Sequence, residues 1–157
     1  MGRREMRGAF VAVNVAWLLG VMLEIRRRKG RTMPRILSVG QCGFDHASIA
    51  RHFRKAFNAE VAGADSFGEA LGVLRSGTFD LVLINRVTDA DSTSGLDLIR
   101  SLKADPALGA LPVMLVSNYE TAQSEAISLG ALKGFGKTDL GREPFLTAVE
   151  SVFLRIK

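Results

Sequence analysis

The chain has 157 residues, of which 47% are hydrophobic and 24% are charged, and this length and composition suit a single globular domain. Its one cysteine, Cys42, excludes an internal disulfide, and two histidines beside it exclude a cysteine-rich zinc site. The formal net charge of +5 would favour nucleic acid or an anionic membrane as a partner only if that charge lay on the folded part.

The excess positive charge lies in a leader, residues 1–32. The leader holds eight basic and two acidic residues, whereas residues 33–157 hold 13 basic and 14 acidic ones. Residues 33–157 therefore form an almost neutral domain, for which we expect no nucleic-acid partner.

Residues 9–25 of the leader form an apolar run. We expect the protein to contact a membrane only if this run inserts into the bilayer. A transmembrane helix needs roughly 20 apolar residues, so this run would make a short span. A cleaved signal peptide is disfavoured because Glu-Ile-Arg-Arg-Arg-Lys follows the run. The other interpretation is that the natural protein begins at Met33. Both surviving interpretations predict a cytoplasmic domain, tethered to the inner face of the membrane in the first case.

From residue 33 onward, short apolar runs alternate with segments whose apolar residues recur every three or four positions. The first pattern is typical of strands and the second of amphipathic helices. In chain order, the sequence predicts a strand at 36–39, a helix around 49–57, a strand at 60–64, a helix at 66–76, a strand at 81–84, a helix at 95–105, a strand at 113–116, a helix at 122–130, a strand at 132–136 and a helix around 144–153.

Five strands alternating with five helices predict an α/β fold with a doubly wound, five-stranded parallel sheet of the flavodoxin-like type. The third strand is wholly apolar, as a central strand covered on both faces should be. In the last two helices, Ile127 and Leu146 are expected on the buried faces. The site of such a sheet lies at the carboxyl ends of its strands, here in the loops 40–45, 85–94 and 117–120 and at 137–139.

Four segments, in this order, resemble the receiver domain of two-component response regulators. They are FDLVLINR at 79–86, SGLDLIRSLKAD at 94–105, PVMLVSN at 112–118 and GALKGFGK at 130–137. The resemblance covers residues 33–154. It implies a CheY-like (βα)5 fold and a role in phosphorelay signal transduction.

The family's chemistry uses an acidic pair that holds Mg²⁺, an aspartate that accepts the phosphoryl group, a hydroxyl and a lysine. In this chain the acidic pair falls on Gly40 and Gln41, and the acceptor falls on Asn85; only Ser117 and Lys137 match. An amide is a poor nucleophile and a weak Mg²⁺ ligand. We therefore expect a degenerate phosphorylation site, a pseudo-receiver with no bound metal, no cofactor and no enzymatic activity.

Three further positions bear on this site. Gly134 stands where the family usually has an aromatic residue, with Phe135 one place later, and Thr138 replaces the proline that usually follows the lysine. Without a phosphoryl group to bind, Lys137 is expected either to pair with Asp45 or to form a hydrogen bond with Asn85.

Two alternatives stay open. The loop after the third strand holds Asp89 and Asp91, either of which would be a displaced phosphoacceptor unless both are simply turn residues. The loop Gly40–Gly43 before a helix would suit an anion, and hence a small-ligand or nucleotide-binding domain. It lacks the lysine of a P-loop and the third glycine of a dinucleotide-binding fingerprint.

The favoured interpretation is a stand-alone receiver-like domain that works by protein–protein interaction without phosphorylation. Its expected partner is a histidine kinase or a downstream effector. The family resemblance places the surface where partners and homodimers meet at residues 119–154, with Tyr119 and Phe135 as exposed contacts.

Overall fold

The computed structural model describes residues 33–156. The strands are β1 (Arg35–Val39), β2 (Glu60–Ala64), β3 (Leu81–Asn85), β4 (Val113–Val116) and β5 (Leu132–Phe135). The helices are α2 (Gly43–Phe57), α3 (Phe67–Ser76), α4 (Gly95–Ala104), α5 (Glu120–Ser128) and α6 (Glu143–Ile156), with a 3-10 turn η1 at Lys137–Asp139. The alternation predicted from the sequence is confirmed. The apolar run at 9–25 lies outside the described residues, and no helix within 33–156 is long and apolar enough to cross a membrane.

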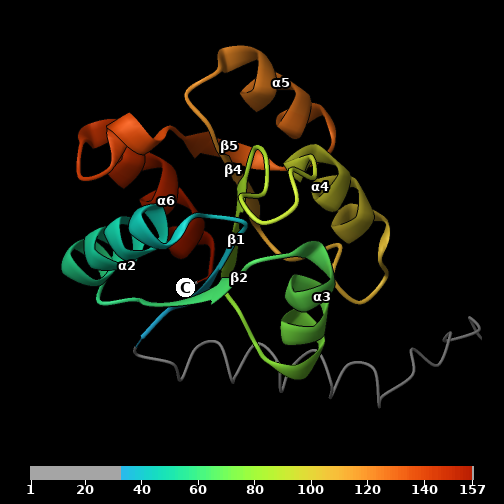
Figure 1. Ribbon diagram of the computed structural model, residues 1–157. Coiled ribbons are helices and arrows are strands. Elements are labelled where there is room, and N and C mark those ends of the chain that lie inside the picture. The colour runs from blue at the N-terminus through green and yellow to red at the C-terminus, as the bar shows by residue number, and fades with distance from the viewer. Residues whose placement is uncertain (1–32, 157) are drawn as a thin grey trace, which may run out of the picture. The chain divides into compact units, whose positions relative to one another are not determined.

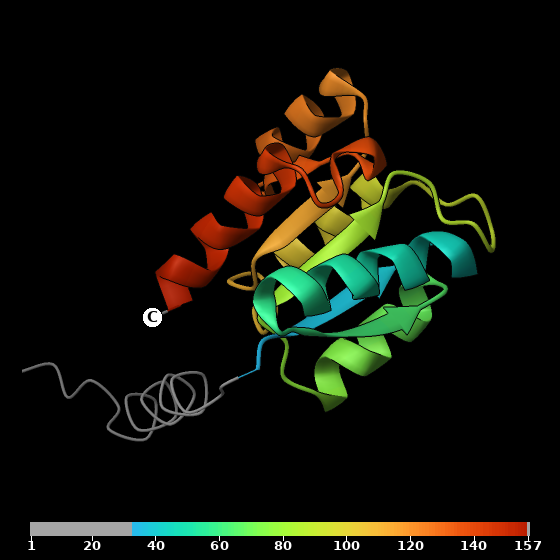
Figure 2. The ribbon, with the colours of Figure 1, turned by 90° about the vertical axis from the view of Figure 1, so that its left-hand side faces the viewer.

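The five strands form one parallel sheet in the order β2-β1-β3-β4-β5, so the predicted doubly wound topology is confirmed. Helices α2 and α6 cover one face, and α3, α4 and α5 cover the other (Figure 1). The strands run the same way, and the long loop after β3 extends beyond their carboxyl ends (Figure 2). Because the strand order reverses between β1 and β3, the ends of these two strands are where such sheets place a site.

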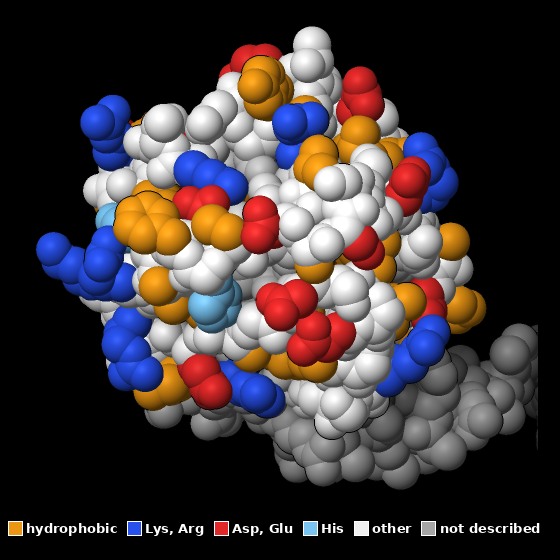
Figure 3. Space-filling model, in the orientation of Figure 1, with side chains coloured by type: hydrophobic (Ala, Val, Ile, Leu, Met, Phe, Trp, Pro, Cys, Tyr) orange, Lys and Arg blue, Asp and Glu red, His pale blue; other side chains and the backbone are white. Residues whose placement is uncertain are grey.

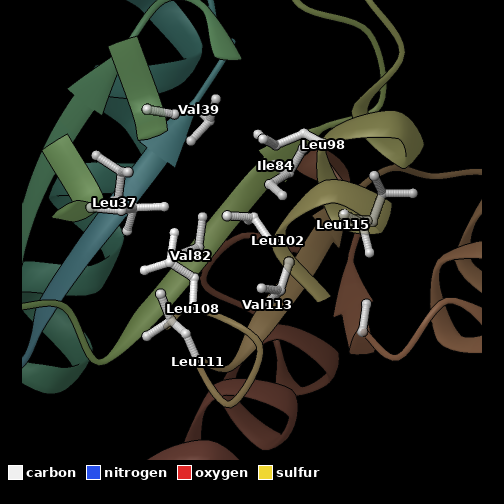
Figure 4. Packing of buried hydrophobic residues seen from close by; sticks show 14 of the residues in the cluster. Leu37, Val39, Val82, Ile84, Leu98, Leu102, Leu108, Leu111, Val113 and Leu115 are labelled. Atoms are coloured by element: carbon white, nitrogen blue, oxygen red, sulfur yellow. The ribbon is translucent and has the colours of Figure 1, made fainter. Parts of the chain in front are cut away.

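The two faces of the sheet differ in their aromatic content. The α3–α4–α5 face packs mainly aliphatic residues, among them Val82, Ile84 and Leu98 (Figure 4). The α2–α6 face adds a cluster of phenylalanines to its aliphatic residues: the rings of Phe53 and Phe145 are 5.1 Å apart at their centroids and meet edge to face. Such aromatic pairs add about 1 kcal/mol each beyond the area they bury.

Phe135 belongs to this aromatic core, so the prediction that it is an exposed partner contact is wrong. Its side chain is 2% exposed, and its ring lies 5.0 Å from that of Phe145. The reason is a register shift: Met114 pairs with Leu132 but Val116 pairs with Phe135, so β5 carries one extra residue. Without this bulge, residues three apart would face opposite sides of the sheet.

Two smaller predictions about buried faces are also wrong. Ile127 on α5 is 46% exposed and Leu146 on α6 is 37% exposed. Both helices bury a narrower stripe than the sequence suggested. The inward positions are filled by Ala122, Gln123 and Ala126 on α5 and by Phe145, Val149 and Val152 on α6.

Candidate functional site

Asn85, at the carboxyl end of β3, ties together the loops that follow β1 and β3. Its side-chain nitrogen Nδ2 donates to the carbonyl oxygen of Gly40 at 3.0 Å and to that of Val87 at 2.6 Å. Carbonyl oxygens only accept hydrogen bonds, so the nitrogen of the amide, and not its oxygen, must face them. The position predicted for the phosphoacceptor therefore holds a hydrogen-bond donor.

Gly40 and Gln41, which stand where the receiver family has its acidic pair, do not fit a Mg²⁺ ion. Gly40 has no side chain, and Thr88 Cγ2 lies 2.7 Å from where a Cβ atom would stand. Gln41 is buried, and neither atom of its carboxamide has a hydrogen-bond partner among the described residues. Mg²⁺ prefers carboxylate oxygens, and residues 33–156 contain no group of three acidic, histidine or cysteine side chains placed to hold a metal.

Lys137 pairs with Asp45, which is one of the two partners expected from the sequence. Its Nζ atom lies 2.5 Å from Asp45 Oδ2 in the first turn of α2. The hydrogen bond from Lys137 is the main reason that the pKa of Asp45 is lowered, and a hydrogen bond with the Cys42 thiol lowers that pKa further. This ion pair joins α2 to the segment after β5. The positive charge of Lys137 is therefore balanced by a carboxylate of the same chain, that of Asp45.

Ser117 lies at the end of β4, where the sequence predicted the hydroxyl of the site. It is 7% exposed, and its Oγ atom accepts a hydrogen bond from the backbone N–H of Tyr119 at 3.1 Å. Nearby, Asn118 Oδ1 accepts a hydrogen bond from the Thr138 hydroxyl at 3.1 Å. The loop after β4 is thereby linked to η1, in which Thr138 replaces the proline usual in the family.

Gln123 on α5 is a structural residue of the site that the sequence did not reveal. Its buried carboxamide donates to the carbonyl oxygens of Leu115 and Ser117 at 3.0 and 3.1 Å, and it accepts from the N–H of Gly134 at 3.1 Å. A Cβ atom at Gly134 would stand 2.0 Å from the Leu115 oxygen, so only glycine fits there. The sequence signal that could have pointed to this arrangement is Gly134, because a glycine inside a strand often marks a bulge or a close approach of another group.

Asp91 serves as a turn residue in the loop after β3. Its Oδ1 atom accepts hydrogen bonds from the hydroxyl of Thr88 and from both the hydroxyl and the N–H of Thr93, at 2.6 and 3.1 Å for Thr93. These hydrogen bonds, that from Thr88 first, lower the pKa of Asp91. The neighbouring Asp89 is exposed, and its N–H donates to the Gly40 oxygen. The contacts of Asp91 favour the turn interpretation over a displaced phosphoacceptor.

The loop Gly40–Gly43 makes most of its contacts within the chain. Gly40 has a φ of +73°, donates its N–H to Ala64 at 2.8 Å, and packs against Thr88. Cys42 is the N-cap of α2, and its sulfur accepts the N–H of Asp45 at 3.5 Å. Because Gly40 already packs against Thr88 and bonds within the chain, this end of the loop has no free space for a ligand. This observation disfavours the small-ligand alternative.

A groove runs between α5, β5 and α6, within the segment predicted to hold the partner surface. It has a volume of about 860 Å³, and its walls include Lys133, Thr147, Ser151 and Arg155. Tyr119, beside the start of α5, is 61% exposed, as expected of a contact residue. On the face seen in Figure 3, basic side chains are most frequent along the left edge, and acidic ones gather toward the lower centre.

Solved structures similar to this chain include response regulators and their receiver domains. The response regulator CheY4 of Vibrio cholerae shares 16% identity and a TM-score of 0.58, over 80% of this chain and 100% of that one. This chain has the receiver fold. The receiver domain of a Francisella response regulator gives 18% identity and a TM-score of 0.62, over 79% and 99% of the two chains.

A third similar structure is the receiver domain of a DNA-binding response regulator from Colwellia psychrerythraea. It shares 19% identity with a TM-score of 0.61, over 78% of this chain and 97% of that one. No family model matches the sequence. The receiver fold is therefore carried by a divergent sequence, in which the residues of the site must be judged by their own contacts.

Proposed function

We propose that this chain is a receiver-like module of two-component signalling that binds a protein partner without being phosphorylated. The observation that carries the proposal is the pair of hydrogen bonds from Asn85 Nδ2 to the carbonyl oxygens of Gly40 and Val87. These bonds hold the loops after β1 and β3 together by contacts within the chain. The same position in a phosphorylated receiver would carry a negatively charged acceptor.

The proposal includes the absence of catalysis and of a bound Mg²⁺. An amide at position 85 has no negative charge with which to attack a phosphoryl group, and its nitrogen faces the two carbonyls. Hard cations bind oxygen atoms, and no carboxylate stands at Gly40 or Gln41. Binding to a partner is then the function that the fold retains.

The partner surface in this proposal is the groove between α5, β5 and α6, which accommodates a segment of a histidine kinase or downstream effector. Its lining mixes the apolar wall of Leu132 with charges of both signs, such as Lys133 and Glu143. Protein interfaces commonly combine an apolar centre with a polar rim. Because Gln123 and Gly134 hold β5 in place from inside the groove, this surface needs no covalent signal to form.

One experiment tests the absence of phosphorylation. The full chain is incubated with acetyl phosphate and Mg²⁺ and run on a phosphate-affinity gel. We expect a single unshifted band, for the chain and for its Asp89→Asn and Asp91→Asn variants alike. A shifted band that disappears in either variant would instead identify a displaced acceptor.

A second experiment tests the partner surface with two matched serines. Ser151 on α6 and Ser76 on α3 are both exposed, and each hydroxyl donates to the carbonyl three residues earlier, at 2.7 and 3.1 Å. Only Ser151 lines the groove. We expect Ser151→Arg to reduce capture of the partner from the native organism's lysate by about tenfold or more, and Ser76→Arg to leave it unchanged. Equal capture by both variants would contradict the proposed surface.

A further inference from the structure

Helix α2 exposes a face that carries three cations, one aromatic ring and no carboxylate. This α2 face consists of the exposed residues Phe44, Ala47, Arg51, Arg54 and Lys55. Successive residues of a helix are about 100° apart, so these five fall within an arc of about 100°. Asp45, the only acidic residue of α2, lies outside this arc and pairs with Lys137. The charged groups of the α2 face are therefore all positive.

The three cations of the α2 face are not neutralised by neighbouring side chains. Among residues 33–156, no carboxylate lies within salt-bridge distance of Arg51, Arg54 or Lys55. The other helices each expose an acidic residue: Glu69 on α3, Asp97 on α4, Glu125 on α5 and Glu150 on α6. Although residues 33–157 are almost neutral as a whole, their charges are segregated, and basic side chains gather along the left edge in Figure 3, where α2 lies in Figure 1.

Phe44 adds an aromatic ring to this positive charge. It is 82% exposed, more than any other large hydrophobic side chain of the described residues, whereas Phe53 and Phe57 of the same helix pack in the aromatic core. Basic side chains attract anionic headgroups, and an aromatic ring enters the boundary between headgroups and acyl chains. Together they suit the surface of an anionic bilayer.

The chain enters the domain beside the end of α2. The helix ends at Phe57, and three residues later the N–H of Glu60 donates to the carbonyl oxygen of Pro34 at 2.8 Å. In the sequence, residues 26–31, shortly before this point, hold five arginines and lysines. If residues 9–25 insert, the leader would keep the domain at the bilayer, where weak binding by the α2 face is enough for a second contact. This order of segments favours a bilayer over an acidic protein as the partner.

We propose that the α2 face binds the surface of an anionic lipid bilayer, with Arg51, Arg54 and Lys55 at the headgroups and Phe44 in the interface. Each basic residue near such a surface raises the affinity about fivefold, so three raise it roughly a hundredfold. No residue of the α2 face lines the groove between α5, β5 and α6, so the proposal stands whether or not that groove binds a protein.

The test measures whether lipid covers the α2 face of the full chain. Cys42→Ser removes the single cysteine and keeps a side chain that caps helices, and Ala47→Cys then holds a fluorescent label on the α2 face. In the matched control the label is held by Ala104→Cys, at an exposed position of α4 on the other side of the sheet. Acrylamide, an uncharged quencher dissolved in water, reports whether each label is accessible.

Vesicles of phosphatidylcholine with about 30% phosphatidylserine should protect the label at position 47 and leave the label at position 104 accessible. Vesicles of phosphatidylcholine alone should protect neither label, even if residues 9–25 insert, because their surface carries no net charge. Protection of both positions, of neither, or on both kinds of vesicle would overturn the proposal.

Two matched pairs of substitutions test the charge of the α2 face. Arg51→Gln combined with Lys55→Gln should raise the lipid concentration for half-protection of position 47 about thirtyfold. Arg75→Gln combined with Arg100→Gln removes the same charge from exposed positions of α3 and α4 and should change that concentration less than about twofold. Equal effects of the two pairs would show that net charge, and not the α2 face, governs binding.

Two further measurements separate a lipid partner from an acidic protein. Phe44→Ala should weaken binding to the phosphatidylserine vesicles several-fold, because the ring no longer enters the interface. Polyglutamate at the same concentration of negative charge replaces the vesicles in a parallel titration. If the polymer protects position 47 as well as the vesicles do, the face binds acidic polypeptides and the proposal of a lipid partner fails.

Discussion

The half of the site built on β1 and β3 carries no charged side chain at Gly40, Gln41 or Asn85, whereas the half built on β4 and β5 keeps Ser117 and Lys137. In the first half, the amide of Asn85, whose nitrogen donates to two carbonyl oxygens, stands where the receiver family has its phosphoacceptor carboxylate. In the second, the lysine remains and finds an internal carboxylate, Asp45. The first half therefore offers no carboxylate to a cation at these positions, whereas the second keeps a cation that pairs with a carboxylate of the same chain.

The largest expected effect concerns Gln123, which supports the half on β4 and β5. Gln123→Leu keeps the size of the side chain but leaves two carbonyls and one N–H without their partner, so we expect a loss of about 2–4 kcal/mol of unfolding free energy. Urea denaturation measures it. The adjacent, exposed Ser124→Leu is the control and should change stability by less than about 0.5 kcal/mol. Equal effects of the two variants would show that the carboxamide supports nothing.

Asn85→Asp tests the half on β1 and β3. Without divalent cations, the introduced carboxylate would face two carbonyl oxygens, and we expect a loss of about 1–3 kcal/mol at pH 7. Protonation of that carboxyl supplies one donor again, and the two carbonyl oxygens raise its pKa in the folded chain, so the loss should shrink as the pH falls from 7 and be smallest below about 4, the usual pKa of an aspartate. Denaturation at both pH values measures this, and a variant as stable as the parent at pH 7 would contradict the assigned amide orientation.

Gln41→Met should act in the opposite direction and raise the free energy of unfolding by about 1 kcal/mol. The buried carboxamide has no partner among the described residues, so a similar apolar side chain avoids its desolvation cost. Thermal unfolding measures the change. A clear loss of stability would show that Gln41 makes a polar contact in solution.

The smallest expected effect is that of Asp45→Asn. Both partners of the ion pair are partly exposed, so we expect a loss of only about 0.5–1 kcal/mol at pH 7. Because Lys137 lowers the pKa of Asp45, the contribution is present above the usual pKa of an aspartate and disappears as the pH falls below about 4. The chain and the variant should therefore converge in stability at low pH. Asp97→Asn, in an exposed pair with Arg100 within α4, is the control and should change less.

Much of the fold could be predicted from local patterns, and part of the site could not. The apolar run of β3 and the cap at Ser66 fix where elements lie, since both signals are contained in neighbouring residues. Whether Phe135 is buried or exposed depended on a bulge in the pairing of β4 with β5, which local patterns do not reveal. Lys137 and Asp45 are 92 residues apart in the sequence. The sequence therefore predicted two alternative partners for Lys137, Asp45 and Asn85, and the packing of α2 decided between them.

By itself, the sequence determined the order of strands and helices, the near-neutral charge of the domain and the identity of the residues at the strand ends. These follow from composition and from the periods of strand and helix. Only the tertiary structure decided that the Asn85 nitrogen faces two carbonyls, that Gln123 bonds the N–H of Gly134, and that Arg86 lies against the ring of Tyr119. Each of these contacts joins residues from different elements, whose distances depend on how the whole sheet and its helices pack.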